Sequence, residues 1–275
     1  MRIEMDSEGK RSEQFVHMEK SGFIATLILD RPEMKNSLNI GMLIRIAEYL
    51  DELSATDDIR TVVIRGEGGK AFSSGYNISE ISKDITEDYL QTLKGKNPLD
   101  IGLSAIERYP YPVIAMIEGY ALGAGCELAM TCDIRVASDD SLIGIPPSRL
   151  GVIYHPAGIQ KFINIMGMAY AQEALYTGRY YTMERAKEMG MVNYVVPKAS
   201  LQSFTYQLAE EIAGNAPLSL KGHKHIFRKI LNNQVLHEND LPEIEKLIAN
   251  AFRSEDFKNG SLAFFQKRKP VFKGC

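Results

Sequence analysis

The stretch EGYALGAGCELAMTCD, residues 118–133, carries the clearest fold signal in the chain. The run just before it, PVIAMI at 112–117, is apolar and rich in β-branched side chains, which predicts a buried strand. Several glycines then indicate a tight turn, and the apolar spacing after them is typical of a helix. A strand, a glycine turn and a helix start in this order predict an α/β fold, with backbone N–H groups exposed at a helix N-terminus.

Glu127 is the one carboxylate inside this predicted helix, and Cys126 and Leu128 flank it. An unpaired charge is costly to bury, so a carboxylate at this place predicts an acid/base function. The N–H groups of the helix start could stabilise a negative charge that develops nearby during a reaction.

The length and composition of the chain are those of an ordinary globular protein. The 275 residues suit one large domain, or one domain with an appendage, and 45% of them are hydrophobic and 24% charged. The formal net charge of −3 gives no electrostatic reason to expect nucleic acid or an anionic membrane as a partner. No apolar run reaches membrane-spanning length, and Cys126 and Cys132 have a poor spacing for a metal. We therefore expect a soluble cytoplasmic protein with free thiols and no metal.

Strand and helix patterns alternate up to about residue 197, and the rest of the chain is helical in pattern. The predicted organisation is a polar leader at 1–14, an α/β core at 15–200 and a C-terminal helical region at 201–275. Asn39 is a predicted N-cap, and so is Thr182. We expect strands at 15–29 (a hairpin), 61–65, 112–117, 134–137, 141–145 and 191–196, and helices at 39–54, 158–165 and 169–176.

Three segments carry a resemblance to a known family: FSSGYNISE at 72–80, IEGYALGAGCELAMTCDIRVAS at 117–138 and FFQKRKPVFKG at 264–274. The chain resembles the crotonase family, also called the enoyl-CoA hydratase/isomerase family. The resemblance implies a crotonase-like ββα spiral core with a C-terminal helical region that forms a homotrimer or a dimer of trimers. It also implies an acyl-CoA substrate of the kind used in fatty acid metabolism. Coenzyme A would then be part of the substrate, and no separate cofactor is expected.

The resemblance also assigns site residues. Two backbone N–H groups of the family hold the thioester oxygen, and by motif position these belong to Tyr76 and Ala124. Basic residues of the early loop and of the C-terminus match the places where the family meets coenzyme A. The predicted CoA-binding residues are Arg31, Lys35, Ser74, Lys267 and Lys269.

Glu127 matches the first of two catalytic glutamates in the hydratases of the family, but the second position is Pro147 here. Proline can neither give nor take a proton, so ordinary hydration by two carboxylates lacks one partner. The segment 147–154 resembles the methylmalonyl-CoA decarboxylases instead, which also carry a proline at that place and a Leu-Gly-Val-x-Tyr sequence. Tyr154 is the tyrosine of that motif and is a candidate catalytic residue.

Several functions therefore remain open from the sequence. Retention of Glu127 slightly favours an enoyl-CoA hydratase-type lyase, and Pro147 with Tyr154 favours decarboxylation of a malonyl-type CoA. An enoyl-CoA isomerase, which needs only one proton-shuttling carboxylate, is a third possibility. A non-catalytic crotonase-fold binding protein is the alternative from a different class. His155, a lone loop histidine next to Tyr154, is interpreted as structural.

Overall fold

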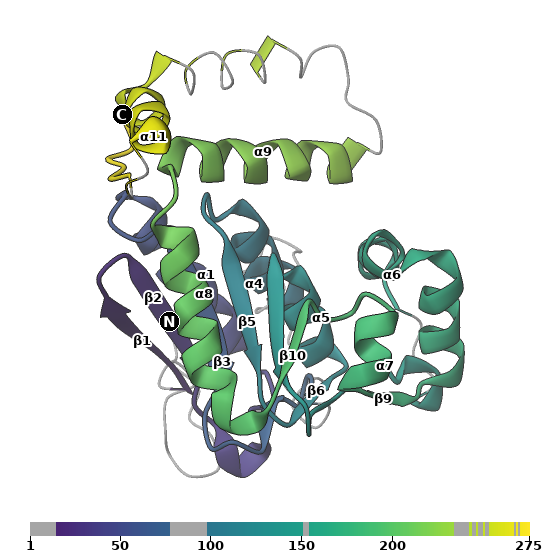
Figure 1. Cartoon of the computed structure of the whole chain (residues 1–275). Coiled ribbons are helices and arrows are strands. Elements are labelled where there is room, and N and C mark those ends of the chain that lie inside the picture. The colour runs from purple at the N-terminus through teal and green to yellow at the C-terminus, as the bar shows by residue number, and fades with distance from the viewer. Residues whose placement is uncertain are drawn as a thin grey trace, which may run out of the picture.

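The computed structural model describes residues 15–77, 98–150, 154–233, 242–243, 246, 250, 253–266, 268 and 270–275 (Figure 1). The predicted leader at 1–14 and the predicted CoA-contact residues Lys267 and Lys269 lie outside the described residues. No helix among the described residues is long and apolar enough to cross a membrane.

The larger sheet has six strands in the order β1-β2-β3-β5-β7-β10. Its strands are β1 (Val16–Ser21), β2 (Ile24–Leu29), β3 (Thr61–Gly66), β5 (Val113–Ile117), β7 (Ile134–Ser138) and β10 (Tyr194–Val196). The hairpin β1-β2 is antiparallel, and every other pair in this sheet is parallel. Parallel neighbours need crossover connections, which is why helices alternate with these strands along the chain.

A second sheet of short strands runs in the order β4-β6-β8-β9. Its strands are β4 (Ala71–Ser73), β6 (Tyr120–Leu122), β8 (Leu142–Gly144) and β9 (Tyr180–Thr182). Three times the chain gives a strand to the large sheet, the next strand to the small sheet, and then an α-helix. These units are β3-β4-α4 (α4 Pro98–Arg108), β5-β6-α5 (α5 Ala124–Thr131) and β7-β8-α6 (α6 Pro156–Thr177). The repeated ββα unit of the predicted fold is confirmed.

Helices cover both faces of the large sheet (Figure 1). Val113, Ala115 and Ile117 of β5 belong to the main core, together with buried residues of α1 (Ile40–Ser54) and α4. The alternate residues Ile114 and Met116 pack in a second cluster against α8 (Leu201–Ala213) on the other face. Side chains of a strand point alternately to the two faces, so a strand covered on both faces is apolar throughout.

Local signals in the sequence placed several element ends correctly. The Asn39 side chain accepts a hydrogen bond from the Met42 N–H at 2.9 Å, so the predicted N-cap of α1 is confirmed. Thr182 likewise caps α7 (Met183–Glu188). The two helices expected at 158–165 and 169–176 are both present within α6, on either side of a kink at the non-helical Gly167. The strand expected at 191–196 is shorter, because only the last three residues pair with β7 as β10.

The C-terminal helices continue from α8 into α9 (Pro217–Asn233), and α11 (Glu255–Phe265) follows further along the chain. Two lysines of α9 join it to the core. The Lys224 ammonium donates to the Asp133 carboxylate at 2.6 Å and to the Tyr111 carbonyl at 2.9 Å. Lys221 pairs with Asp57 at 2.9 Å.

Candidate active site

Two glycine turns, one after β4 and one after β6, touch each other because these strands are neighbours in the small sheet. Gly75 has a φ of +105°, and a Cβ there would lie 2.8 Å from the Leu122 carbonyl oxygen and 3.5 Å from the Ala124 nitrogen. On the opposite side, a Cβ at Gly125 would lie 2.5 Å from the Ser73 carbonyl oxygen. Contacts this short exclude a side chain, so glycine is required for the two turns to meet.

Tyr76 and Ala124, whose backbone N–H groups are the predicted thioester-binding pair, lie on these two turns. Ala124 is the first residue of α5, so no carbonyl earlier in that helix can accept its N–H. Tyr76 forms an isolated β-bridge with Leu38. That bridge uses the Gly75 carbonyl and the Asn77 N–H, at 2.8 and 3.0 Å, and not the Tyr76 amide itself. Because successive groups of an extended chain alternate in direction, the Tyr76 N–H points away from Leu38.

The loop that carries Lys35 packs against the first of these turns. The Ser74 N–H donates to the Lys35 carbonyl at 3.0 Å, and the exposed Lys35 ammonium lies 5.5 Å from the centre of the Tyr120 ring. The structure therefore brings Lys35 and Ser74 together. Arg31 is placed differently, because it is only 5% exposed and its guanidinium packs over Phe15 at 5.2 Å.

Asn36 fixes the shape of this loop. It is fully buried and has a φ of +53°, a conformation that asparagine tolerates better than most residues. Its side-chain oxygen accepts from the Arg31 N–H at 2.9 Å, and its side-chain nitrogen donates to the carbonyls of Glu67 and Ala71 at 3.0 and 2.7 Å. A single amide thus ties the lysine-bearing loop to the segment that joins β3 to β4.

Glu127 is completely buried on α5, one turn from the helix start. Both of its carboxylate oxygens accept hydrogen bonds. The Tyr154 hydroxyl donates to Oε2 at 2.8 Å, and Nε2 of His155 lies 3.1 Å from Oε1. Burial and the neighbouring Glu127 charge raise the pKa of Tyr154 far above its usual value, so this hydroxyl keeps its proton. Each oxygen of this buried carboxylate therefore has a partner.

His155, interpreted as structural from the sequence, contacts the predicted catalytic acid directly. It is also the N-cap of α6, since its Nδ1 accepts from the Gly158 N–H at 3.3 Å. A local signal for the cap is present in the sequence, because Pro156 follows at the first helical position. The contact with Glu127 has no such signal, because the two residues belong to different ββα units.

Pro147, which occupies the place of the second glutamate, begins the short 3-10 helix η3 (Pro147–Leu150). The two side chains after it, Ser148 and Arg149, are exposed. The Arg149 guanidinium lies 5.3 Å from the Tyr180 ring centre, and the Ser148 hydroxyl lies beside Gly178. The sequence from 141 to 172 contains no aspartate or glutamate, so this whole segment supplies no second carboxylate.

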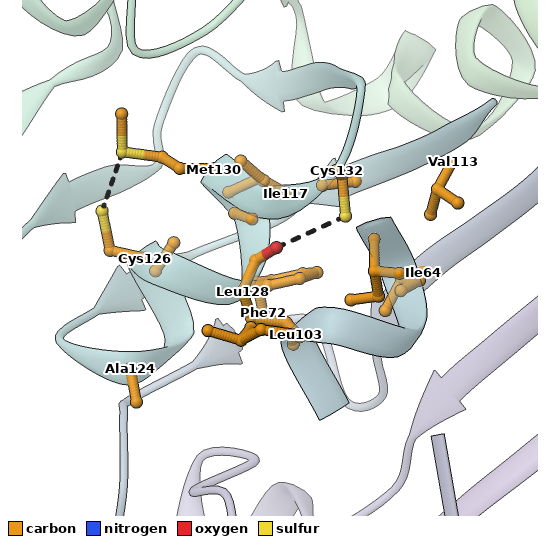
Figure 2. Close-up of a cluster of buried hydrophobic side chains, with 14 of the residues drawn as sticks. Ile64, Phe72, Leu103, Val113, Ile117, Ala124, Cys126, Leu128, Met130 and Cys132 are labelled. Carbon is orange, nitrogen blue, oxygen red and sulfur yellow. Dashed lines mark hydrogen bonds between the residues drawn. The ribbon is translucent and has the colours of Figure 1, made fainter. Parts of the chain in front are cut away.

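Apolar side chains surround α5. Figure 2 shows Cys126 and Cys132 among side chains that include Phe72 and Leu103, with the Cys126 sulfur 3.7 Å from that of Met130. Burial raises the pKa of both thiols, that of Cys132 to about 12. No group of three or more potential metal ligands occurs among the described residues.

Comparison with known proteins supplies the family. The sequence model of the family described as Enoyl-CoA hydratase/isomerase matches residues 19–275. The chain is 30% identical to the short-chain-enoyl-CoA hydratase of Clostridium acetobutylicum, over 92% of this chain and 95% of that protein. It is 32% identical to the 2,3-dehydroadipyl-CoA hydratase of Escherichia coli, over 91% of this chain and 95% of that protein. Among solved structures, an enoyl-CoA hydratase/carnithine racemase from Magnetospirillum magneticum matches with a TM-score of 0.86 and 30% identity, over 95% of this chain and 96% of that one. This chain belongs to the enoyl-CoA hydratase/isomerase (crotonase) family.

Proposed function

We propose that this protein is an acyl-CoA lyase of the enoyl-CoA hydratase type, in which Glu127 is the single proton-transferring carboxylate. The observation that carries the proposal is the state of Glu127, which is fully buried and accepts hydrogen bonds from Tyr154 and His155. These two contacts hold the carboxylate in one orientation, from which it can exchange a proton with a water molecule or the substrate.

In this reaction Glu127 takes a proton from a water molecule while the water oxygen bonds to the β-carbon of an enoyl thioester. The electrons of the double bond move toward the thioester oxygen, which becomes an enolate oxygen. The N–H groups of Tyr76 and Ala124 would stabilise that oxygen, and one such donor contributes about 2.7–4 kcal/mol. Glu127 then returns the proton to the α-carbon and is ionised again. The direct contact between the two glycine turns supports this role for the pair.

The contact between Tyr154 and Glu127 argues against decarboxylation, although Pro147 and the segment 147–154 resemble the decarboxylases. The Tyr154 hydroxyl already donates to Glu127, so it has no second proton for a departing substrate carboxylate. An ionised Glu127 at the same place would also repel that carboxylate. The observation favours proton transfer over loss of CO2.

A second candidate reaction is the isomerisation of an enoyl-CoA. It is favoured by the absence of any aspartate or glutamate between residues 141 and 172, because moving one proton between two carbons requires only one carboxylate. Hydration and isomerisation share the enolate, the amide pair and Glu127. They differ only in whether a water molecule is held against the β-carbon.

We also propose that the early loop binds coenzyme A. Lys35 and Ser74, which lie side by side at the first glycine turn, have the stronger support. The assignments of Arg31, which is buried, and of Lys267 and Lys269 remain predictions. So do a homotrimer or dimer of trimers built through the 201–275 region, a cytoplasmic location and the absence of a separate cofactor.

The test compares wild type with Glu127→Gln on crotonyl-CoA, a 3-enoyl-CoA and methylmalonyl-CoA, read by enoyl absorbance and by CO2 release. Glutamine fits the site, since its oxygen can accept from His155 while its amino group donates to the Tyr154 oxygen. We expect the variant to fold normally and to lose about 10²–10⁴-fold in kcat for hydration or isomerisation. Full activity of the variant, or turnover of methylmalonyl-CoA alone, would contradict the proposal.

A further inference from the structure

We propose that His155 is a positioning residue for Glu127, held as a neutral imidazole with its proton on Nε2 by the first turn of α6. Tyr154 holds one carboxylate oxygen and His155 holds the other, so the plane of the carboxylate is fixed from both sides. The catalytic consequence rests on the proposed function of Glu127, whereas the state of the imidazole does not.

The N-cap decides which ring nitrogen carries the proton. Nδ1 of His155 lies 3.3 Å from the Gly158 nitrogen, whose N–H can only donate, so Nδ1 is the acceptor. In a neutral imidazole the proton is then on Nε2, which donates to Oε1 of Glu127 at 3.1 Å. The cap thereby makes His155 a fixed donor to the carboxylate.

The position at the helix start also opposes a second proton on the ring. An imidazolium would have to give up the hydrogen bond from Gly158, and its charge would face the positive end of the α6 dipole. The carboxylate of Glu127 would instead attract that positive charge. Among the described residues, Tyr154 beside His155 and Cys126 on α5 are also titratable groups near the pair. Lys161 of α6 is engaged elsewhere, with its ammonium 2.6 Å from the Thr131 hydroxyl and 2.9 Å from Glu107.

The rings of Tyr154 and His155 fill the space beside Gly158 at the start of α6. A Cβ at Gly158 would lie 2.8 Å from Cδ1 and Cε1 of Tyr154 and 2.9 Å from Nε2 of His155. The rings themselves stack at 5.5 Å with an angle of 22°, and Tyr154 also packs on Phe162 at 5.3 Å. Gly158, which has no side chain, therefore donates its N–H to the capping His155 and leaves room for both donors to reach Glu127.

The first measurement is the state of the imidazole, which needs no substrate. Long-range 1H–15N spectra of wild type and His155→Asn identify the His155 signals by difference, and His223→Asn, at an exposed position on α9, serves as the control. We expect a neutral ring with the proton on Nε2 at pH 7. A ring protonated on Nδ1, alone or together with Nε2, would overturn the proposal.

The second measurement separates the cap from the contact with Glu127. In His155→Asn the side chain is a good N-cap but is too short to reach the carboxylate, whereas in His155→Gln an amide N–H can reach it but caps poorly. We expect His155→Asn to keep the melting temperature of wild type, while the acid limb of its kcat/KM profile moves up by about one to two pH units. His155→Gln should have a lower melting temperature than wild type, and the acid limb of its kcat/KM profile should stay at the wild-type pH.

The outcomes distinguish the two proposals. An unmoved acid limb in His155→Asn, in a protein whose wild type turns over an enoyl-CoA, would overturn the positioning role and leave the proposed function intact. If wild type turns over no CoA thioester, the proposed function fails, and the 15N spectra alone decide whether the cap fixes the imidazole.

Discussion

Substitution of Gly158 by alanine should destabilise the protein, although alanine has the higher helix propensity. In a helix, alanine is more stable than glycine by about 0.5–1 kcal/mol. Here the new Cβ would lie 2.8 Å from two carbons of the Tyr154 ring, and overpacking of this kind destabilises by about 1–3 kcal/mol. We therefore expect a net loss of about 0.5–2 kcal/mol, which lowers the melting temperature by a few degrees in a chain of this size.

The effect on activity should be larger than the effect on stability. Either ring that moves away from the new Cβ takes its donor away from Glu127, and misplacement of a catalytic group by about 1 Å can lower the rate 10²-fold. Steady-state kinetics with the best enoyl-CoA substrate give kcat, and thermal unfolding gives the stability. The loss in kcat should persist well below the melting temperature.

Gly222→Ala is the matched control for this experiment. Gly222 also lies within a helix, α9, but a Cβ there would meet nothing within 4 Å. This variant should gain about 0.5–1 kcal/mol and keep wild-type activity. If Gly158→Ala behaved in the same way as Gly222→Ala, the crowding of Tyr154 and His155 at the start of α6 would be refuted.

Two further predictions concern groups outside the site. Under native conditions at neutral pH, a thiol reagent should label the exposed Cys275 and spare Cys126 and Cys132, because burial raises the pKa of both inner thiols. Peptide mass analysis identifies the labelled cysteine. Labelling of Cys126 or Cys132 before unfolding would contradict the prediction. Lys221→Met should destabilise by no more than about 1 kcal/mol at pH 7, because the lysine holds the pKa of the largely exposed Asp57 below its usual value. A carboxyl group whose pKa is lowered by folding stabilises the folded protein at pH values above its pKa in the unfolded chain, which for aspartate is about 4. The difference in the free energy of unfolding between wild type and variant, measured with urea, should therefore shrink as the pH falls below about 4 toward the lower pKa of folded Asp57. A difference that grows on acidification would exclude the ion pair as its cause.

The sequence by itself determined the features that depend on neighbours in the chain. The burial of β5 on both faces follows from its continuous apolar run, and the start of α1 follows from Asn39. The glycines at 75 and 123 indicated two tight turns because a left-handed φ is accessible to glycine at little energetic cost. These signals act over a few residues, so they can be recognised without knowing which segments meet in space.

Only the tertiary structure decided which of these segments come together. The pairing of β4 with β6 places the turn at Gly75 against the turn at Gly123, although the strands are too short to show a pattern of their own. The donor of His155 to Glu127 depends on how α6 packs against α5, and a lone histidine in a loop carries no local mark of such a partner. Local periodicity and capping fix the elements, whereas the contacts between ββα units depend on long-range packing, and the surroundings of Glu127 consist of such contacts.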